Sequence, residues 1–433
     1  MNRTLIYNLD SKIGSLVLVQ GFVQTLRDQS HMQFLIIRDH TGSVQVVNEK
    51  SKSTMSAEIS SLTQGSTVSI LGTLVTNDKV KLNGHEIQLE KISIETLAAT
   101  PLPIDDATEL DKRLDWRFLD LRSSRSLLVF RIQTAIEEAM REYWYKNNFL
   151  EIHSPKLMPT ASEGGAELFQ LPYFDWTTAS LAQSPQFYKQ MAMMAGFDRV
   201  FEIGPVFRAN KSFTPRHDTE FTSVDMEVAW IQDHSNLMVL EESWLHHILS
   251  RISDRYGEQI EKEFGVKVTI PQLPFPRIPL AEARRILASK GHVFSPGDDL
   301  DPQGERLLAE YVKSTFGHEF VFVPDFDTSI RPFYHMRHPD NPNLTRSFDL
   351  IWKGTEITTG AQREHRLEIL QAQILEKGLS IEALQPYVDF FKYGAPPHGG
   401  MGVGLTRILM LLLGLKNVRE VTYLFRGPTR LTP

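Results

Sequence analysis

The segment 199–230 carries the clearest chemical pattern in the chain. It predicts two strands, 199–208 and 221–228, joined by a polar loop. In the second strand a period of two places Asp225 and Glu227 on one face, opposite an apolar face. Two carboxylates on one strand face repel each other, so we expect this face to meet either water or a cation.

Cationic residues lie near these carboxylates in the sequence. Arg208 ends the first strand, and Arg216 and His217 lie in the loop. Because the planar guanidinium group matches phosphate oxygens, this combination favours a binding site for a polyanion. Considered in isolation, a solvent-exposed sheet face explains the two carboxylates equally well.

A second pattern, 347–360, predicts a hairpin in which Lys353 and Gly354 form a two-residue turn. The expected register pairs Trp352 with Thr355, Ile351 with Glu356, and Asp349 with Thr358. Asp349 and Glu356 then lie diagonally on one face, within reach of a shared ion. Carboxylate oxygens with few other ligands suit Mg²⁺ retained by a nucleotide, and a solvated sheet edge is the alternative for this pair alone.

The position of Arg363 depends on the shape of the second hairpin strand. Strict alternation from Glu356 places the Arg363 side chain on the opposite face of the sheet. Gly360 is the residue of this strand most able to bend or bulge it and so redirect Arg363. The sequence leaves both orientations open.

A third pattern is the glycine-rich segment 394–407. Its glycines allow close approach of a ligand or a neighbouring strand. A helix that begins near Gly404 places Arg407 in its first turn, where a cation opposes the helix dipole. We therefore expect an anionic or aromatic partner for Arg407. The segment lacks the Gly-Lys-Ser/Thr of a Walker loop and the strand and acidic residue of a Rossmann fingerprint.

Helices and strands must position these residues, and the sequence predicts two domains joined by a linker. Residues 1–98 predict five or six short strands and a small closed barrel such as an OB-fold, for which a purely structural role is the alternative. A proline-punctuated linker, 99–123, follows. The remaining residues, 124–433, mix helices and strands. Helices are expected over 124–147, 232–265 and 303–316, with an insertion at roughly 266–316.

The composition of the chain excludes several classes of protein. Its 433 residues carry 46 Lys+Arg and 53 Asp+Glu, a formal charge of −7, and no cysteine. The absence of cysteine excludes disulfides, thiolate metal sites and a cysteine nucleophile. The longest apolar run near the C-terminus, 408–413, is too short to span a bilayer, and the first 30 residues lack a signal-like apolar stretch. We therefore expect a cytoplasmic protein without a membrane partner.

Three segments together resemble the class II aminoacyl-tRNA synthetases. Residues 148–155 resemble motif 1, 207–227 resemble motif 2 and 402–407 resemble motif 3. The resemblance extends over essentially the whole chain and is greatest to the aspartyl-tRNA synthetases of class IIb, of the shorter archaeal and eukaryotic type. It implies an N-terminal all-β OB-fold barrel for anticodon binding and an α+β class II catalytic domain built on an antiparallel sheet.

The resemblance also implies a reaction and the residues that bind ATP. The expected reaction is the ATP-dependent activation of L-aspartate to aspartyl-adenylate and its transfer to the 3′ end of tRNA(Asp), with tRNA(Asn) as an open second substrate. The implied nucleotide ligands are Arg208 on the α-phosphate, Phe221 and Arg407 on the two adenine faces, Arg216 and His217 on the β- and γ-phosphates, and Asp349 and Glu356 on Mg²⁺.

Further residues are implied for aspartate. They are Glu163 and Asp225 at the ammonium group, Gln186 at the α-amino acid end, Lys189 and Arg363 at the side-chain carboxylate, and Thr359 beside them. Two buried cations around a small pocket are tolerable only if an anion joins them. On that argument asparagine, which is neutral, is rejected by roughly 2–5 kcal/mol.

The resemblance implies partner surfaces as well. Phe34, Gln45 and the nearby Arg27 match positions that contact anticodon bases, although Phe34 could instead be a core residue. Pro155 of motif 1 would lie in the interface of a homodimer. The sequence departs from the family at Asn210, Thr406 and 424–428. These departures leave two alternatives open, which are an asparagine-specific relative and a divergent paralogue that binds RNA or an amino acid without charging tRNA.

Overall fold

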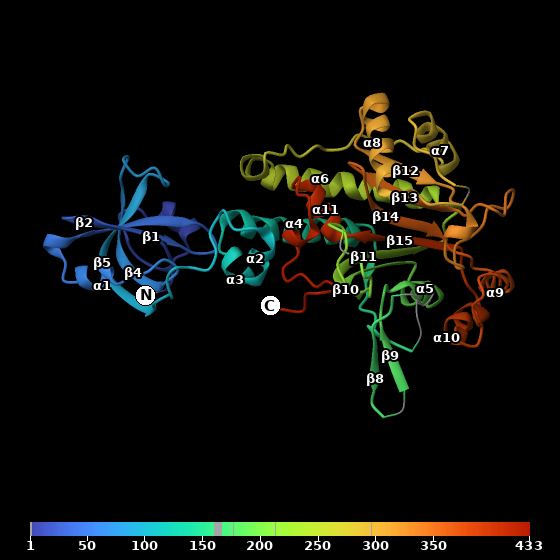
Figure 1. Cartoon of the computed structure of the whole chain (residues 1–433), viewed down its shortest axis with the longest axis horizontal. Coiled ribbons are helices and arrows are strands. Elements are labelled where there is room, and N and C mark those ends of the chain that lie inside the picture. Colours follow the sequence, from blue (N-terminus) through green and yellow to red (C-terminus); the bar gives the residue numbers. More distant parts are fainter. Residues whose placement is uncertain (1, 160–166, 176, 213, 296) are drawn as a thin grey trace. The chain divides into compact units, whose positions relative to one another are not determined.

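The computed structural model describes residues 2–159, 167–175, 177–212, 214–295 and 297–433 (Figure 1). Contacts between residues divide the chain into two units, Met1–Leu127 with Pro433, and Leu128–Thr432. Residues 99–123, expected as a linker, therefore group with the barrel. No helix within the described residues is long and apolar enough to cross a membrane.

The first unit contains a closed five-stranded barrel with the strand order β1-β2-β3-β5-β4. Its strands are β1 (Leu16–Asp28), β2 (Met32–Arg38), β3 (Ser43–Glu49), β4 (Thr67–Thr76) and β5 (His85–Thr96). Its helical elements are η1 (Ile6–Lys12), η2 (Lys50–Lys52), α1 (Ser56–Ser60), α2 (Leu110–Asp115) and α3 (Arg117–Asp120). The predicted OB-type barrel is confirmed.

Alternation along β2 separates the barrel core from its outer face. Leu35 and Ile37 are fully buried, whereas Phe34 is half-buried and lies outside the hydrophobic core cluster. Phe34 pairs with Arg27 of β1, and Ile36 pairs with Gln45 of β3. Cross-strand partners share a face, so Arg27, Phe34 and Gln45 lie together on the outer face.

The second unit is built on a seven-stranded sheet with the order β12-β13-β14-β15-β11-β10-β6. Its strands are β6 (Leu150–Glu151), β10 (Arg199–Phe207), β11 (Glu220–Ala229), β12 (Phe320–Pro324), β13 (Ser347–Trp352), β14 (Thr355–Gln362) and β15 (His398–Gly404). All neighbours are antiparallel except β6 and β10. The expected antiparallel class II sheet is therefore confirmed.

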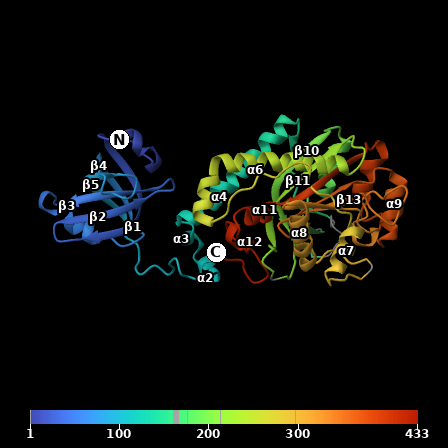
Figure 2. The same cartoon turned by 90° about the horizontal axis from the view of Figure 1, so that it is seen from above.

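Three helices share one hydrophobic core with a single face of this sheet (Figure 2). They are α4 (Ser124–Lys146), α6 (Ser235–Phe264) and α11 (Leu405–Leu412). Trp144 of α4 stacks on Phe201 of β10 and on Trp244 of α6, with ring centroids 4.3 and 5.0 Å apart. Because these helices cover one face of β11, the face that carries Asp225 remains available for a ligand.

The residues expected as an insertion form part of the sheet's packing. They contain α7 (Leu280–Ser289), which the sequence analysis did not predict, and α8 (Pro302–Phe316). Both helices pack in a hydrophobic cluster with Val321 and Val323 of β12. The C-cap of α8 is Gly317, whose left-handed φ of 66° favours glycine.

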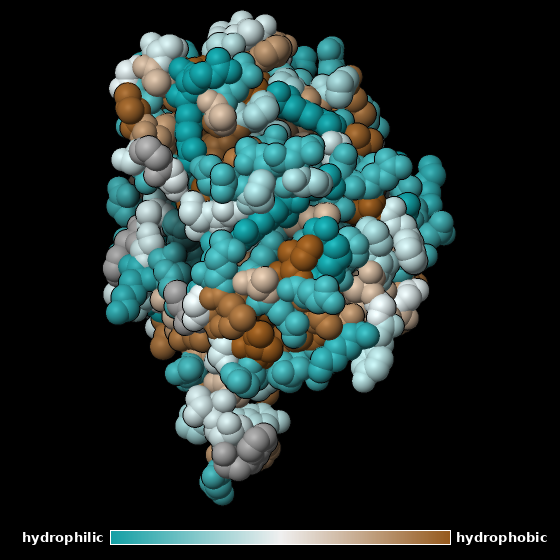
Figure 3. Space-filling model, turned by 90° about the vertical axis from the view of Figure 1, so that its right-hand side faces the viewer, coloured by the Kyte–Doolittle hydropathy of each residue, from teal (hydrophilic) through white to brown (hydrophobic). Residues whose placement is uncertain are grey.

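The remaining elements surround the sheet. A three-stranded sheet contains β7 (Leu157–Met158), β8 (Gln170–Tyr173) and β9 (Thr177–Leu181). The smaller helices are α5 (Gln186–Met194), η3 (Thr328–Ile330), α9 (Leu367–Glu376), α10 (Gln385–Val388), η4 (Asp389–Tyr393) and α12 (Val418–Val421). On the face drawn in Figure 3, hydrophilic residues predominate around smaller hydrophobic patches.

Candidate active site

A cavity of about 450 Å³ lies in the second unit, and its size suits a small-molecule ligand. Eleven residues that the sequence analysis assigned to the nucleotide or to aspartate line its wall: Gln186, Lys189, Arg208, Arg216, His217, Phe221, Asp225, Glu356, Thr359, Arg363 and Arg407. They come from α5, β11, β14, α11 and the β10–β11 loop, and Arg363 directly follows β14. Segments far apart in the sequence therefore converge on one cavity. Glu163 lies outside the described residues.

The hairpin of β13 and β14 places several of these side chains. Lys353 and Gly354 have φ angles of 48° and 78°, the positive pair that a type I′ turn requires. The predicted pairing of Ile351 with Glu356 is confirmed, as is that of Trp352 with Thr355. The predicted pairing of Asp349 with Thr358 is wrong, because Asp349 pairs with Thr359.

A β-bulge causes this difference in register. The shift falls between Leu350 and Ile351 and leaves Ile357 as the additional residue of β14. As a result Glu356, Thr359 and Arg363 line the same cavity, although strict alternation would separate them. The redirection comes from the bulge and not from Gly360.

Gly360 has a different role in the strand. A Cβ atom at this position would lie 2.3 Å from the ring of Phe348, which is fully buried. Real Cβ atoms do not approach a ring so closely, so a side chain here would displace a core residue. Gly360 therefore allows β13 and β14 to pair closely over the core.

The carboxylates of β11 meet cations, as one of the two sequence-based readings predicted. Lys189 Nζ lies 2.8 Å from Asp225 Oδ1 and 3.6 Å from Glu227 Oε2. Arg363 Nε donates a hydrogen bond of 3.0 Å to Glu227 Oε1, and its Nη2 donates one of 3.3 Å to Oε2. All four side chains are at least nine-tenths buried.

This network corrects the expected charge balance of the pocket. Lys189 and Arg363 already have Asp225 and Glu227 as protein counter-ions, so the premise that only an anionic ligand could balance them is wrong. The guanidinium group of Arg363 has five N–H donors, and the two bonds to Glu227 use two of them. Lys189 Nζ also donates a 3.0 Å hydrogen bond to the backbone oxygen of Met401, so the donors that the network leaves for a ligand are mainly the remaining N–H groups of Arg363.

A second group of residues that line the cavity is cationic and aromatic. Arg208 is exposed, and its guanidinium carbon lies 5.5 Å from the centroid of the Phe221 ring. Arg407 Nη1 donates a 2.9 Å hydrogen bond to the backbone oxygen of Glu356 and lies 3.6 Å from the carboxylate. The anionic partner expected for Arg407 is thus Glu356 of the same chain.

The β10–β11 loop adds two further groups. Arg216 is paired with Glu305 of α8 at 2.8 Å, so its charge is already partly compensated. Burial and the nearby Arg407 and Arg216 lower the pKa of His217, which favours a neutral ring at pH 7. His217 hydrogen-bonds to Thr214.

Asp349 and Glu356 were assigned to Mg²⁺, and the donor set fits that ion. Asp349 Oδ2 accepts a 2.6 Å hydrogen bond from Arg331, while Oδ1 is buried without a hydrogen-bond partner among the described residues. Burial raises the pKa of Asp349, Arg331 opposes this, and repulsion from Glu356 adds to it. A buried, unpartnered carboxylate oxygen beside a second carboxylate is a suitable ligand for a hard cation.

The sequence analysis missed several residues of the site, among them three ionisable ones. Arg331 and His335 line the cavity from the irregular segment between β12 and β13, and Glu305 enters from α8 as the partner of Arg216. Burial and four nearby cations, of which Arg363 has the largest effect, hold the pKa of His335 well below its usual range. No periodicity marks this segment, so only the tertiary structure identifies these residues.

The family departures lie at or near the same cavity. Asn210 and Thr406 line it, and Asn210 Oδ1 accepts a 2.7 Å hydrogen bond from the backbone nitrogen of Ser212. In 424–428, the backbone oxygen of Arg426 accepts a 3.0 Å hydrogen bond from Thr219. None of these departures replaces a residue of the Lys189–Arg363 network.

Comparison with known families agrees with this geometry. The model of class II tRNA synthetases (D, K and N) matches residues 109–426. The chain belongs to this family. In this synthetase the model of the OB-fold nucleic acid binding domain also matches residues 17–95.

Alignments with individual relatives extend over almost the whole synthetase. It is 42% identical to an aspartate–tRNA(Asp) ligase of Pyrococcus abyssi, with 97% of each chain covered. It is 39% identical to an aspartate–tRNA(Asp/Asn) ligase of Aeropyrum pernix, covering 99% of this chain and 98% of the relative. Among solved structures, an asparaginyl-tRNA synthetase of Pyrococcus horikoshii in complex with asparaginyl-adenylate has a TM-score of 0.93 at 31% identity, with both chains fully covered.

Proposed function

We propose that this synthetase is an aspartate–tRNA ligase that forms aspartyl-adenylate from L-aspartate and ATP and transfers aspartate to tRNA. One observation carries the proposal: a single cavity is lined by Arg208, Phe221 and Arg407 and also by Lys189 and Arg363, and Phe221 and Asp225 lie four residues apart along β11. This arrangement suits a nucleotide and a small dicarboxylic acid side by side. The names of the relatives at about 40% identity support the same activity.

In the first step the α-carboxylate of aspartate attacks the α-phosphorus of ATP, and pyrophosphate leaves. The nucleophile is already ionised, so no general base is required. Arg208 stabilises the negative charge on the α-phosphate, while Phe221 and Arg407 hold the adenine between them. Positioning both substrates in one cavity supplies much of the remaining rate acceleration.

Mg²⁺ would be held by Asp349 and Glu356, and when bound it supplies further charge stabilisation for the phosphates. In the second step the terminal 3′-hydroxyl of tRNA attacks the carbonyl carbon of the adenylate, and AMP leaves. The expected partners are therefore ATP, Mg²⁺, L-aspartate and tRNA. The proposed location is the cytoplasm.

Selection of aspartate follows from the donors of the pocket. Gln186 and Asp225 would bind the α-amino acid end, and Glu163 is assigned to the ammonium group by resemblance alone. Arg363 and Lys189 offer only N–H donors to the side chain of the substrate. The side-chain carboxylate of aspartate accepts hydrogen bonds from these N–H groups. The side-chain NH₂ group of asparagine is itself a donor, so it cannot accept a hydrogen bond from them. Such a mismatch costs roughly 2–5 kcal/mol in a buried site.

The outer face of the barrel is the proposed anticodon site. Phe34 is half-buried outside the barrel core, and Arg27 and Gln45 share its face. An aromatic side chain beside a cation and an amide suits a splayed single-stranded base. Gln45 Nε2 also donates a 2.7 Å hydrogen bond to Glu86, which fixes the position of the amide.

We also propose a homodimer that uses the motif 1 region. Pro155 is exposed, and the apolar side chains of Leu150 and Leu157 are 52% and 45% exposed on either side of it in the sequence. β6 forms an edge of the seven-stranded sheet, so its outer backbone groups are available for a second copy.

Charging assays test the complete reaction. We expect the purified protein to attach labelled aspartate to tRNA(Asp) in the presence of ATP and Mg²⁺. A parallel reaction with tRNA(Asn) determines whether the enzyme acts on both tRNAs, as the name of the Aeropyrum pernix relative states for that protein. Formation of the adenylate without charging of either tRNA would contradict the proposed transfer step and favour a divergent paralogue.

A further inference from the structure

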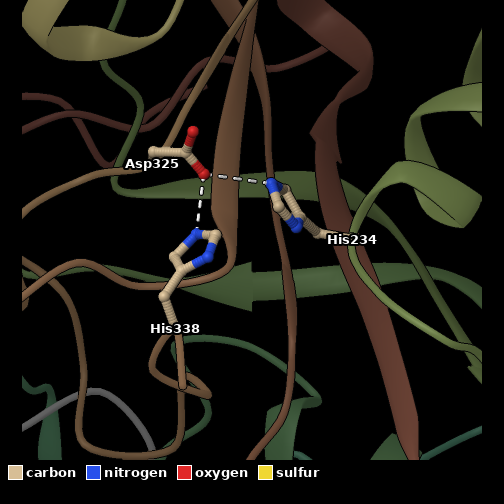
Figure 4. A group of neighbouring side chains, drawn as sticks. All are labelled: His234, Asp325 and His338. Carbon is tan, nitrogen blue, oxygen red and sulfur yellow. Dashed lines mark hydrogen bonds and ion pairs between the residues drawn. The ribbon is translucent and has the colours of Figure 1, made fainter. Parts of the chain in front are cut away.

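A cluster of two histidines and one aspartate lies at the end of β12. His234 precedes α6, Asp325 follows β12, and His338 lies in the segment between β12 and β13 (Figure 4). None of the three lines the catalytic cavity. The cluster is therefore separate from the residues assigned to ATP, aspartate and Mg²⁺.

Both histidine rings point toward the same carboxylate oxygen of Asp325 (Figure 4). Asp325 Oδ1 lies 2.8 Å from His338 Nε2 and 3.3 Å from His234 Nε2. All three donor atoms lie within 4.8 Å of one another, and the two rings are perpendicular. In a tetrahedral zinc site with bonds of 2.0–2.1 Å, neighbouring donor atoms are about 3.3 Å apart. Small side-chain adjustments would therefore bring the cluster to that geometry.

The chemistry of the donors indicates the kind of metal. Two imidazole nitrogens and one carboxylate oxygen suit Zn²⁺ and neighbouring transition metals, whereas Mg²⁺ and Ca²⁺ prefer oxygen ligands alone. The side chains of Asp325 and His338 are each 27% exposed, and that of His234 is 10% exposed. An ion can thus enter from solvent and retain water as its fourth ligand.

We propose that His234, Asp325 and His338 form a binding site for a transition-metal ion of the Zn²⁺ type. The ion would hold together three segments that are separate in the sequence. These are the start of α6, the end of β12 and the segment between β12 and β13, which contains His338 and also His335. That segment also carries Arg331, so the metal would hold two lining residues of the catalytic cavity in place from outside it. The role is structural, and the ion takes no part in adenylation.

Cobalt spectroscopy on the tag-free, full-length protein tests the proposal without reference to activity. We expect metal-depleted protein to bind one Co²⁺ with the intense visible absorption of a tetrahedral site, and an equimolar amount of Zn²⁺ to remove that absorption. Excess Mg²⁺ should leave it unchanged. His338→Asn and Asp325→Asn should lose the absorption, whereas His31→Asn, at an exposed position in the barrel, should retain it.

The alternative is a histidine–aspartate–histidine hydrogen-bond cluster that binds no metal. Absence of the Co²⁺ absorption in the wild-type protein would establish this alternative and overturn the proposal, as would full retention of the absorption in both cluster variants. A thermal measurement provides a second readout, because Zn²⁺ should raise the Tm of the wild-type protein and of His31→Asn but not that of Asp325→Asn. An equal rise in Asp325→Asn would likewise count against the site.

Discussion

Arg363→Leu is expected to lower aspartate-dependent ATP–pyrophosphate exchange at least about 30-fold while ATP binding stays within a few-fold of the wild type. Arg363 is 97% buried as a side chain and lies in the aspartate part of the cavity, whereas the proposed nucleotide ligands lie elsewhere in it. Losing a buried charged hydrogen bond to the substrate costs roughly 2–5 kcal/mol, or about 30- to 5,000-fold in kcat/KM. Steady-state exchange at varied aspartate, with calorimetric binding of ATP, measures both effects.

Arg363→Leu is also expected to lower the stability of the protein, so a control must separate this effect from the loss of substrate binding. Removing Arg363 leaves the buried Glu227 with Lys189, at 3.6 Å, as its one remaining ion-pair partner among the residues that the structure describes. Such loss of a partner typically costs about 3–5 kcal/mol of stability. The double variant Glu227→Gln/Arg363→Leu removes the unpaired charge and should recover much of the stability without recovering exchange. Arg285→Leu, the same change at an ion pair with Glu282 in which the side chains are 77% and 51% exposed, should behave like the wild type. Recovery of exchange in the double variant would remove Arg363 from the specificity assignment.

Arg208→Gln is expected to slow adenylate formation by about 100- to 1,000-fold, with little change in KM for aspartate. Arg208 is exposed and makes a cation–π contact with Phe221, so its loss should alter the free energy of unfolding by less than about 1 kcal/mol. The effect should therefore appear in the chemical step. Single-turnover formation of the adenylate measures that step directly.

Lys211→Gln provides the matched control for Arg208→Gln. Lys211 lies three residues further along, is exposed, and does not line the cavity. Removing its charge should change the rate no more than two- to threefold. Equal losses in the two variants would show that the general positive charge of the loop, and not the position of Arg208, accelerates the reaction.

Much of the site follows from strand periodicity. A period of two along β11 places Asp225 and Glu227 on the face opposite Val224 and Met226, and the structure confirms that the two carboxylates meet cations there. The hairpin turn at Lys353 is equally local, because its residue types determine its backbone angles. Local patterns therefore predict the strands and the faces that they present.

Contacts between distant parts of the chain decide the features that the sequence analysis did not predict. The bulge at Ile357 depends on how β13 and β14 pair over the core, so neither the partner of Asp349 nor the direction of Arg363 could be derived from alternation. The counter-ion of Arg363 is Glu227, which lies 136 residues away in the chain. The helix α7 was missed because proline- and glycine-rich flanks surround its ten residues. Long-range pairing, and not local propensity, decides each of these features.

The most direct measurement is amino-acid-dependent ATP–pyrophosphate exchange by the wild-type protein with aspartate and asparagine compared side by side. A structural relative with a TM-score of 0.93 is an asparaginyl enzyme, so the fold itself does not separate these two substrates. The donor-only surface of Lys189 and Arg363 predicts a kcat/KM at least about 30-fold higher for aspartate. Exchange that is equal for the two amino acids, or faster with asparagine, would contradict that prediction.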